Sequence, residues 1–374
     1  MRVKGVQQWL LEVLTEAFTD ARKGKLKTYD EHMFEVNWIQ NLIDLRDAIL
    51  ERRYEPGASV AFVVFEPMVR EIFAASFRDR VVHHFLYNMQ AGWWDRRFIY
   101  DSYSCRVGKG TLFGIKRVQR FMRMTSQNYT KKAYIIKMDI QGYFMSLPRR
   151  ELYREVSRGL ELQFAEYMDD PMGQSLFKIC DFLWGQILMD NPVSKARKKG
   201  AEWHWDPDVL PPRKSLFRQP YGIGIVIGNL TSQLVSNIYL NRLDRYIKFE
   251  LGYKYYGRYV DDFVIVVPEE GYAQAKKDIK KIERFAKEEM QLTVHPKKKY
   301  IQEVRKGVSF LGARIYPDCL YPSDRLQSHF KRTADGVVKE YKDIPNLVSY
   351  LGLMKHLDAG KFVRVVTEEL GWEF

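Results

Sequence analysis

Two short runs of β-forming residues, separated only by a pair of aspartates, constrain the fold of this chain more than any other feature. Residues 255–260 and 263–267 are rich in Tyr, Val and Phe, and Asp261 and Asp262 lie between them. Two such runs joined by two residues that favour turns are typical of a β-hairpin. A further β-rich run, residues 133–139, also ends on an aspartate. We therefore predict strands that carry acidic side chains at their ends.

The remaining apolar pattern predicts a mixture of helices and strands. Helical spacing predicts two helices within residues 1–50, one in the second half of 70–88, and others over 151–184, 232–250, 273–290 and most of 325–374. Further strands are predicted at residues 60–65 and 308–315. Residues 191–220 are rich in Pro and basic side chains, which predicts a long loop or insertion. Because strands and helices do not alternate regularly, we predict an α+β fold rather than a doubly wound parallel sheet.

The charge of the chain indicates the class of partner. Lys and Arg number 60 against 47 Asp and Glu, a net charge of +13, which favours a polyanionic partner over a merely soluble basic protein. The three cysteines lie far apart and form no zinc motif, as suits a reducing compartment. The N-terminus lacks the layout of a signal peptide, and the apolar runs are too short to span a bilayer. We expect a cytoplasmic protein without membrane segments.

The acidic strand ends predict a metal-dependent reaction. If Asp139 and Asp261 lie on adjacent strands of one sheet, their carboxylates converge and can share two divalent ions, with Asp262 as a supporting charge. Hard oxygen ligands suit Mg²⁺ better than zinc. We expect two Mg²⁺ ions, held by these three aspartates and the backbone carbonyl of Ile140, and a phosphoryl-transfer reaction. The plain alternative for the Asp-Asp pair is an exposed turn.

Four motifs in the expected order resemble those of reverse transcriptases. Lys-Met-Asp-Ile-Gln-Gly-Tyr-Phe at 137–144 resembles motif A, and Tyr-Val-Asp-Asp at 259–262 resembles motif C. Residues 227–233 resemble motif B, and Gly-Val-Ser-Phe-Leu-Gly at 307–312 resembles the primer grip. Two earlier stretches, 70–84 and 102–111, are similar to the fingers motifs of group II intron and related bacterial reverse transcriptases.

The resemblance implies a right-hand polymerase fold with fingers, palm and helical thumb. It places N-terminal helices and fingers in residues 1–130 and a thumb in 316–374. The palm would occupy residues 131–315, with an inserted fingers segment and the basic loop near 191–220. The implied activity is RNA-templated DNA synthesis.

Motif B indicates a narrower family. Most reverse transcriptases carry Gln-Gly followed by Ser-Pro there, whereas this chain has Ile227-Gly228 and Ser232-Gln233, a form that resembles diversity-generating retroelements. Members of that family copy a template-repeat RNA into cDNA with errors opposite adenine, are encoded by bacteria or phages, and work with an oligomeric accessory variability protein. A glutamine at 227 can hydrogen-bond the incoming nucleotide, whereas Ile227 can only pack, which predicts a looser check on pairing. The alternative is that Ile227 is a plain packing residue.

Other residues of the predicted nucleotide site follow from the same resemblance. Phe144, preceded by Tyr143, would collide with a 2′-hydroxyl, so deoxynucleotides are expected. Arg70 occupies the position that binds triphosphate in related enzymes, although Met68 replaces a lysine that relatives often have nearby. Lys298 matches a motif D lysine that protonates pyrophosphate, or belongs to a solvated basic face. The motif B residues Gly228 and Gln233 complete the predicted site.

Basic residues at suitable positions predict a cradle for template RNA and the cDNA or primer strand. These residues are Arg78, Arg80, Arg106, Lys109, Arg325, Lys331 and Arg332. The segment 191–220 also mixes basic residues with Trp203, His204 and Trp205, as RNA-binding loops do, and would equally suit a protein interface.

Three alternatives stay open. The first is a bacterial reverse transcriptase of the phage-defence or retron type. The second is a non-catalytic RNA-binding protein on the same fold, against which the intact aspartates argue. The third, a nucleotide cyclase with a related palm topology, is the most remote, because cyclases lack motif B and thumb segments.

Overall fold

The computed structural model describes residues 5–24, 28–66, 68–340 and 344–370. The chain divides into two compact units, each made of two separate stretches: Met1–Phe98 with Gly142–Arg242, and Ile99–Gln141 with Leu243–Phe374. Residues 371–374, at the end of the predicted helical tail, lie outside the described residues. The division of the chain into fingers, palm and thumb stays a prediction.

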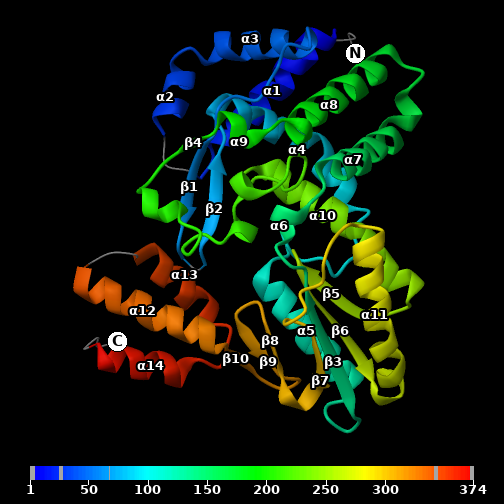
Figure 1. Ribbon diagram of the computed structural model, residues 1–374, viewed down its shortest axis with the longest axis vertical. Helices are drawn as coiled ribbons and strands as arrows, with labels where there is room; N and C mark the ends of the chain where they lie inside the picture. Colours follow the sequence, from blue (N-terminus) through cyan, green and yellow to red (C-terminus); the bar gives the residue numbers. More distant parts are fainter. Residues whose placement is uncertain (1–4, 25–27, 67, 341–343, 371–374) are drawn as a thin grey trace. The chain divides into compact units, whose positions relative to one another are not determined.

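The first unit consists mainly of helices (Figure 1). They are α1 (Val6–Arg22), α2 (Tyr29–Val36), α3 (Trp38–Leu50), α4 (Phe77–Asp95), α6 (Tyr143–Ser146), α7 (Arg149–Phe164), α8 (Pro171–Met189), α9 (Pro192–Lys195) and most of α10 (Leu230–Arg245). The predicted second helix is in fact two helices, α2 and α3, because Asn37 leaves the helical region at φ −124° and ψ 40°. The helix predicted in the second half of 70–88 is α4, which begins at the side-chain cap Ser76.

A small sheet completes the first unit. Strand β1 (Val60–Val64) pairs antiparallel with β2 (Arg70–Ala74) and parallel with β4 (Arg197–Lys198). The segment 191–220 is therefore more ordered than a plain loop: it supplies α9, β4 and short 3₁₀ turns at Glu202–Trp205, Pro212–Lys214 and Leu216–Arg218. It is attached to β2 through the buried carboxylate of Glu71, which accepts hydrogen bonds from Ser215 Oγ at 2.7 Å and the Leu216 N–H at 2.5 Å.

The second unit contains a four-stranded antiparallel sheet in the order β5-β6-β3-β7 (Figure 1). The strands are β5 (Tyr255–Tyr259), β6 (Asp262–Pro268), β3 (Ala133–Asp139) and β7 (Tyr300–Glu303). Helix α5 (Thr111–Thr125) packs against it, and its Ile115 and Val118 share one buried cluster with Ile135, Val264 and Val266. The amphipathic helix predicted near 273–290 is α11 (Tyr272–Glu288), which contacts β6.

The predicted hairpin is present, with its turn one residue earlier than expected. Tyr259 pairs with Asp262, so Val260 and Asp261 form the two-residue connection and Asp262 is the first residue of β6. The helix predicted at 232–250 is α10, followed by a π-helical turn at Tyr246–Glu250.

The described residues at the C-terminal end of the second unit form a three-stranded sheet and three helices. The strands are β8 (Val308–Phe310), β9 (Ala313–Ile315) and β10 (Leu320–Pro322), and the helices are α12 (Asp324–Glu340), α13 (Ile344–Met354) and α14 (Gly360–Glu369). The prediction of a single strand over 308–315 is wrong. The segment forms two antiparallel strands, β8 and β9, joined by a tight turn at Leu311 (φ 54°) and Gly312 (φ 84°). The predicted helical tail is confirmed for the described residues.

The mixture of helices with largely antiparallel sheets confirms the predicted α+β class. Among the described residues, no helix combines the length and the apolar character that a membrane crossing requires.

Close packing at Gly257 makes the central sheet sensitive to one methyl group. A Cβ atom on Gly257 would lie 2.1 Å from Oη of Tyr103, whose ring is fully buried. We expect Gly257→Ala to lower the free energy of unfolding by about 1–3 kcal/mol, measured by urea denaturation. Gly336→Ala, in the middle of α12, is the matched control: beyond the backbone of its own helix, a Cβ there would meet no heavy atom within 4 Å. It should stabilise by up to about 1 kcal/mol. Equal effects of the two substitutions would contradict this packing argument.

Candidate active site

Strand register gathers three aspartates at one end of the four-stranded sheet. Strands β3 and β6 are adjacent and antiparallel, and Asp139 pairs directly with Asp262. Asp261 precedes Asp262 in the turn, and its backbone carbonyl accepts a hydrogen bond from the Ile140 N–H at 3.0 Å. The carboxylates of segments 137–144 and 259–262 therefore lie at the same end of the sheet.

The turn that carries Asp261 has an unfavourable backbone conformation. Val260 lies in the left-handed region at φ 51°, which costs a β-branched residue about 1–3 kcal/mol. Both of its backbone groups are held: its N–H donates to Ser104 Oγ at 3.1 Å, and its carbonyl accepts from Arg258 Nη1 at 2.9 Å. These contacts keep the turn in the conformation that places Asp261 beside Asp139.

A buried ion pair supports the same turn. Arg258 and Asp244 both have fully buried side chains, and two hydrogen bonds of 2.7 Å join Nε to Oδ1 and Nη2 to Oδ2. Tyr256 also donates to Asp244 Oδ1 at 2.6 Å, and Arg258 Nη2 reaches Ser102 Oγ at 3.2 Å. Sequence reasoning missed this network, although an arginine in a strand of otherwise uncharged residues, three positions before an acidic turn, is a usable signal.

The environment of the carboxylates raises two pKa values. Burial raises the pKa of Asp261 to about 7, and the negative charge of Asp139 adds to this effect. Burial also raises the pKa of Asp262 to about 6, opposed by Lys137, whose Nζ lies 3.1 Å from Asp262 Oδ2. Lys298 Nζ lies 3.1 and 3.2 Å from the two carboxylate oxygens of Asp139. The crowded negative charge is thus partly balanced by two ammonium groups.

The segment that carries Lys298 is attached to the end of β3 by backbone hydrogen bonds. The His295 N–H donates to the Asp139 carbonyl at 2.7 Å, and the Gln141 N–H donates to the Thr293 carbonyl at 2.8 Å. Lys298 itself is 58% exposed, so its ammonium group is accessible while it contacts Asp139.

The donor atoms of Asp139, Asp261 and Asp262 are of the type that a hard divalent cation prefers. All three side chains are carboxylates, and Asp262 Oδ1 is buried without a hydrogen-bond partner. In the conformation of the described residues, however, no group of three or more His, Cys, Asp or Glu side chains is arranged as a metal-binding set. Mg²⁺ binding by these aspartates and the Ile140 carbonyl stays a prediction.

The motif B residues predicted for the nucleotide site lie in the first unit. The Ile227 carbonyl accepts from the Phe73 N–H at 2.8 Å, and the Ile227 side chain packs against the cluster that contains Phe73. Gly228 has φ 130°, and a Cβ there would lie 2.5 Å from the Phe73 carbonyl oxygen, so this position requires glycine. Gln233 is exposed on α10. Their contact with a nucleotide stays a prediction.

The other predicted nucleotide-site residues of this unit differ in accessibility. Tyr143 is buried, and its hydroxyl donates to the Ser236 carbonyl at 2.7 Å, so this ring has a packing role. Phe144 is partly buried beside it, with ring centroids 5.5 Å apart. Arg70 is exposed at the start of β2, where it is accessible to an anion.

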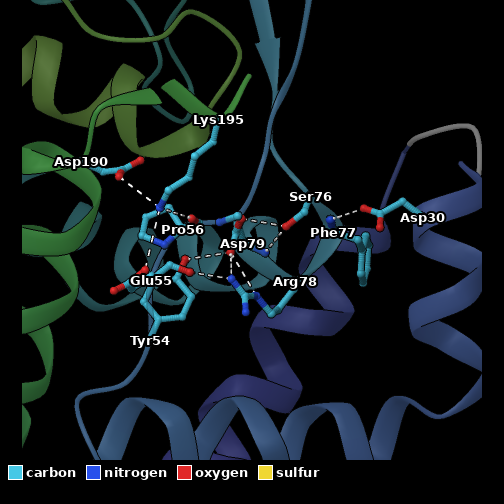
Figure 2. Close-up of polar contacts among 11 residues, drawn as sticks. Asp30, Tyr54, Glu55, Pro56, Ser76, Phe77, Arg78, Asp79, Asp190 and Lys195 are labelled. Atoms are coloured by element: carbon cyan, nitrogen blue, oxygen red, sulfur yellow. Dashed lines mark hydrogen bonds and ion pairs between the residues drawn. The ribbon is translucent and has the colours of Figure 1, made fainter. Parts of the chain in front are cut away.

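The first two residues of the predicted cradle have protein partners. Figure 2 shows Arg78 beside Asp79 and Tyr54: its Nη2 lies 3.0 Å from Asp79 Oδ1 and donates to the Glu55 carbonyl at 2.6 Å. Tyr54 donates to the same Asp79 oxygen at 3.0 Å. Arg80 pairs with the buried Glu31 at 3.0 Å. These guanidinium groups brace the helices of the first unit, and their contact with nucleic acid stays a prediction.

The remaining cradle residues lie in the second unit. Arg106 donates to the Ile99 carbonyl at 2.8 Å and the Ser102 carbonyl at 3.1 Å, and Lys109 donates to the Tyr100 carbonyl. On α12, Arg325 and Arg332 both contact His329, at 3.4 and 2.8 Å. Lys331 forms an ion pair with Glu369 at 2.6 Å. Arg325, Lys331 and Arg332 are exposed, which keeps them accessible to a phosphate backbone.

Comparison with known proteins gives distant similarities. No protein-family model matches the chain. Protein YkfC of Escherichia coli (strain K12) is 23% identical over 343 residues, which cover 82% of this chain and 80% of YkfC. Among solved structures, telomerase from Candida albicans in complex with a TWJ fragment of telomeric RNA matches at a TM-score of 0.47 with 11% identity. That match covers 89% of this chain, which spans 59% of the telomerase chain. At these levels of similarity, the function has to be inferred from the site itself.

Proposed function

We propose that the chain is a reverse transcriptase, an RNA-directed DNA polymerase that uses two Mg²⁺ ions. The observation that carries this proposal is the register of β3 with β6, which pairs Asp139 with Asp262 and puts Asp261 in the adjoining turn. These aspartates belong to sequences that resemble motifs A and C of reverse transcriptases. Phosphoryl transfer is the chemistry that such a carboxylate set supports.

The proposed roles of the site residues follow from their contacts. Asp139, Asp261, Asp262 and the Ile140 carbonyl would hold the metal ions, which when bound supply charge stabilisation at the reacting phosphate. Lys298, already beside Asp139, would donate a proton to the departing pyrophosphate. Lys137 would balance the charge of Asp262. Of the nucleotide-site residues, exposed Arg70 would bind the triphosphate, and the aromatic Phe144 would select deoxynucleotides.

The finer proposal is that the chain copies a template-repeat RNA for a diversity-generating retroelement, with an accessory variability protein as partner. It is supported by the Ile227-Gly228 form of motif B, in which the side chain before the glycine cannot hydrogen-bond a nucleotide. The runner-up is a phage-defence or retron-type enzyme. Flanking DNA separates the two: a pair of repeats that differ only at adenines of the template copy would favour diversification.

Primer extension tests the proposed activity. The full chain, an RNA template with a DNA primer, Mg²⁺ and deoxynucleotides should give extended cDNA, and ribonucleotides should be incorporated poorly. Extension should cease when EDTA removes Mg²⁺ and return when Mg²⁺ is added in excess. A chain that binds the RNA duplex without extending it under any of these conditions would instead support the non-catalytic alternative.

Changing Ile227 to glutamine tests the fidelity argument. We expect Ile227→Gln to lower misincorporation opposite template adenine about tenfold, because a restored hydrogen bond is worth about 1–1.5 kcal/mol in discrimination. Sequencing of the cDNA measures the error spectrum. Ile39→Gln makes the same chemical change at a side chain that is 57% exposed on α3, and should leave the spectrum unchanged. Identical spectra for both variants would remove Ile227 from the explanation of infidelity.

A further inference from the structure

The segment 191–220 forms an exposed aromatic surface on the first unit, which the proposed catalytic site does not use. Strand β4 runs parallel to β1 (Figure 1), with Arg197 opposite Val60 and Lys198 opposite Ala61. The chain after β4 therefore continues in the direction of the C-terminal end of β1. There Trp203 and His204 meet Phe65 at ring-centroid distances of 5.4 and 5.0 Å, and lie 4.2 Å from each other. We call Phe65, Trp203 and His204 the aromatic platform.

The platform rests on an ordered base. The ammonium group of Lys198 lies over the rings of Trp205 and Phe217, at 4.9 and 4.5 Å from their centroids. Phe217 stacks on the buried Phe73 of β2 at 5.6 Å. Together with the hydrogen bonds that Glu71 accepts, these contacts fix the segment to the sheet, so the platform is held in place before any ligand binds.

The outer side of the platform is accessible. Trp203 is 58% exposed and Phe65 is 37% exposed. Large apolar rings that contact each other are usually more deeply buried, so this exposure indicates a binding surface. Arg197 and Lys199, on either side of Lys198, are exposed as well. Residues 191–220 contain seven Lys and Arg against three Asp and Glu, so the surroundings of the rings are positively charged.

We propose that the aromatic platform binds single-stranded RNA, with a base stacked on Trp203 and phosphates held by Arg197 and Lys199. Exposed rings beside cations are the combination that binds single strands, because every base has a stacking face and every linkage carries a negative charge. The excess of positive charge favours a polyanion over an ordinary protein surface. The inference rests on the proposed function in one respect: the bound strand would be the unpaired part of the RNA template.

Binding of oligouridylate RNA to the full chain tests the proposal. Fluorescence anisotropy should show that Trp203→Ala lowers affinity for the single strand about tenfold, the loss of one stacked base. The double variant Arg197→Ala with Lys199→Ala should reduce the slope of log K against log salt by about 1.4, for two lost phosphate contacts. Tyr167→Ala removes a ring of similar exposure, 57%, outside the platform, and should change neither quantity.

A spectroscopic readout identifies the stacked ring directly. The chain has eight tryptophans, so RNA that stacks on Trp203 should quench only part of the total tryptophan fluorescence. Trp203→Phe should abolish this quenching and keep most of the RNA affinity, because phenylalanine still offers a ring for stacking. Unchanged RNA affinity and unchanged quenching in both Trp203 variants would overturn the proposal. If Trp203→Ala instead abolished a concentration-dependent dimer seen by sedimentation and left RNA binding unaltered, the surface would be a protein interface, which also overturns it.

The catalytic proposal and the platform fail in distinguishable ways. The same RNA titrations are made in an Asp261→Asn background, where cDNA synthesis is expected to be absent. If Trp203→Ala lowers RNA affinity tenfold in the Asp261→Asn background, the result supports RNA binding by the platform, whatever the polymerase assay shows. Active extension by the unmodified chain with no effect of Trp203→Ala on RNA binding refutes the platform alone.

Discussion

Replacing Asp261 with asparagine is expected to abolish primer extension and to leave RNA binding nearly unchanged. The substitution keeps the shape of the side chain but removes the charge that lies beside Asp139 in the acidic cluster. A metal ion contributes several kcal/mol of charge stabilisation in phosphoryl transfer, so the rate should fall by about 10³-fold or more. Single-turnover extension measures the rate, and anisotropy with labelled RNA measures binding.

Glu288→Gln is the matched control for this loss. It makes the same carboxylate-to-amide change on an exposed residue of α11, whose Oε2 lies 3.9 Å from Arg284 Nε. Its extension rate should equal that of the unmodified chain. Extension that survives in Asp261→Asn would show that the metal assignment is wrong. Unaltered thermal unfolding of the variant would confirm that the loss is chemical rather than structural.

Breaking the buried ion pair beneath the turn is expected to give the largest loss of stability. Asp244→Asn leaves the Arg258 guanidinium buried without its counter-charge and weakens the acceptor of the Tyr256 hydroxyl. Removal of one partner of a buried pair costs about 3–5 kcal/mol. Urea denaturation measures the change in the free energy of unfolding. Extension should also decline, because Arg258 would hold the Val260 carbonyl less firmly.

The exposed pair between Lys331 and Glu369 offers a matched comparison. Its nitrogen–oxygen distance is 2.6 Å, much like that of the buried pair, but both side chains are about half exposed to solvent, at 52% and 51%. Glu369→Gln should therefore leave the free energy of unfolding almost unchanged, because solvent screens an exposed pair. If the two acid-to-amide changes cost the same, burial would not be the reason for the strength of the Arg258 pair.

The long periodic elements could be predicted from the sequence because their signals are local. Strand β3 ends on Asp139, and the hairpin of β5 and β6 follows from two β-rich runs with two residues between them. Helix α11 follows from apolar residues at helical spacing. In each case neighbouring residues along the chain carry enough information to define the element.

Predictions failed where short-range geometry interrupts a regular pattern. The helix expected before residue 50 is divided at Asn37, and the strand expected over 308–315 turns back at Leu311 and Gly312. Apolar spacing continues through both places, so periodicity gives no sign of the change in backbone direction. For segment 191–220 the prediction erred in the other direction, since the structure has more order than the sequence predicts. Its prolines predict a loop, but its contacts with β1 and β2 give it regular structure.

Local sequence was enough to identify the side chains that bear the candidate chemistry, because Asp139, Asp261 and Asp262 stand at the ends of β-rich runs. The pairing of Asp139 with Asp262, and the contact of the buried Arg258 with the turn between β5 and β6, became evident only in the folded chain. Strand register, burial and the pKa of a carboxylate all depend on contacts between segments that are far apart along the chain. Such contacts leave no periodic trace in either segment alone.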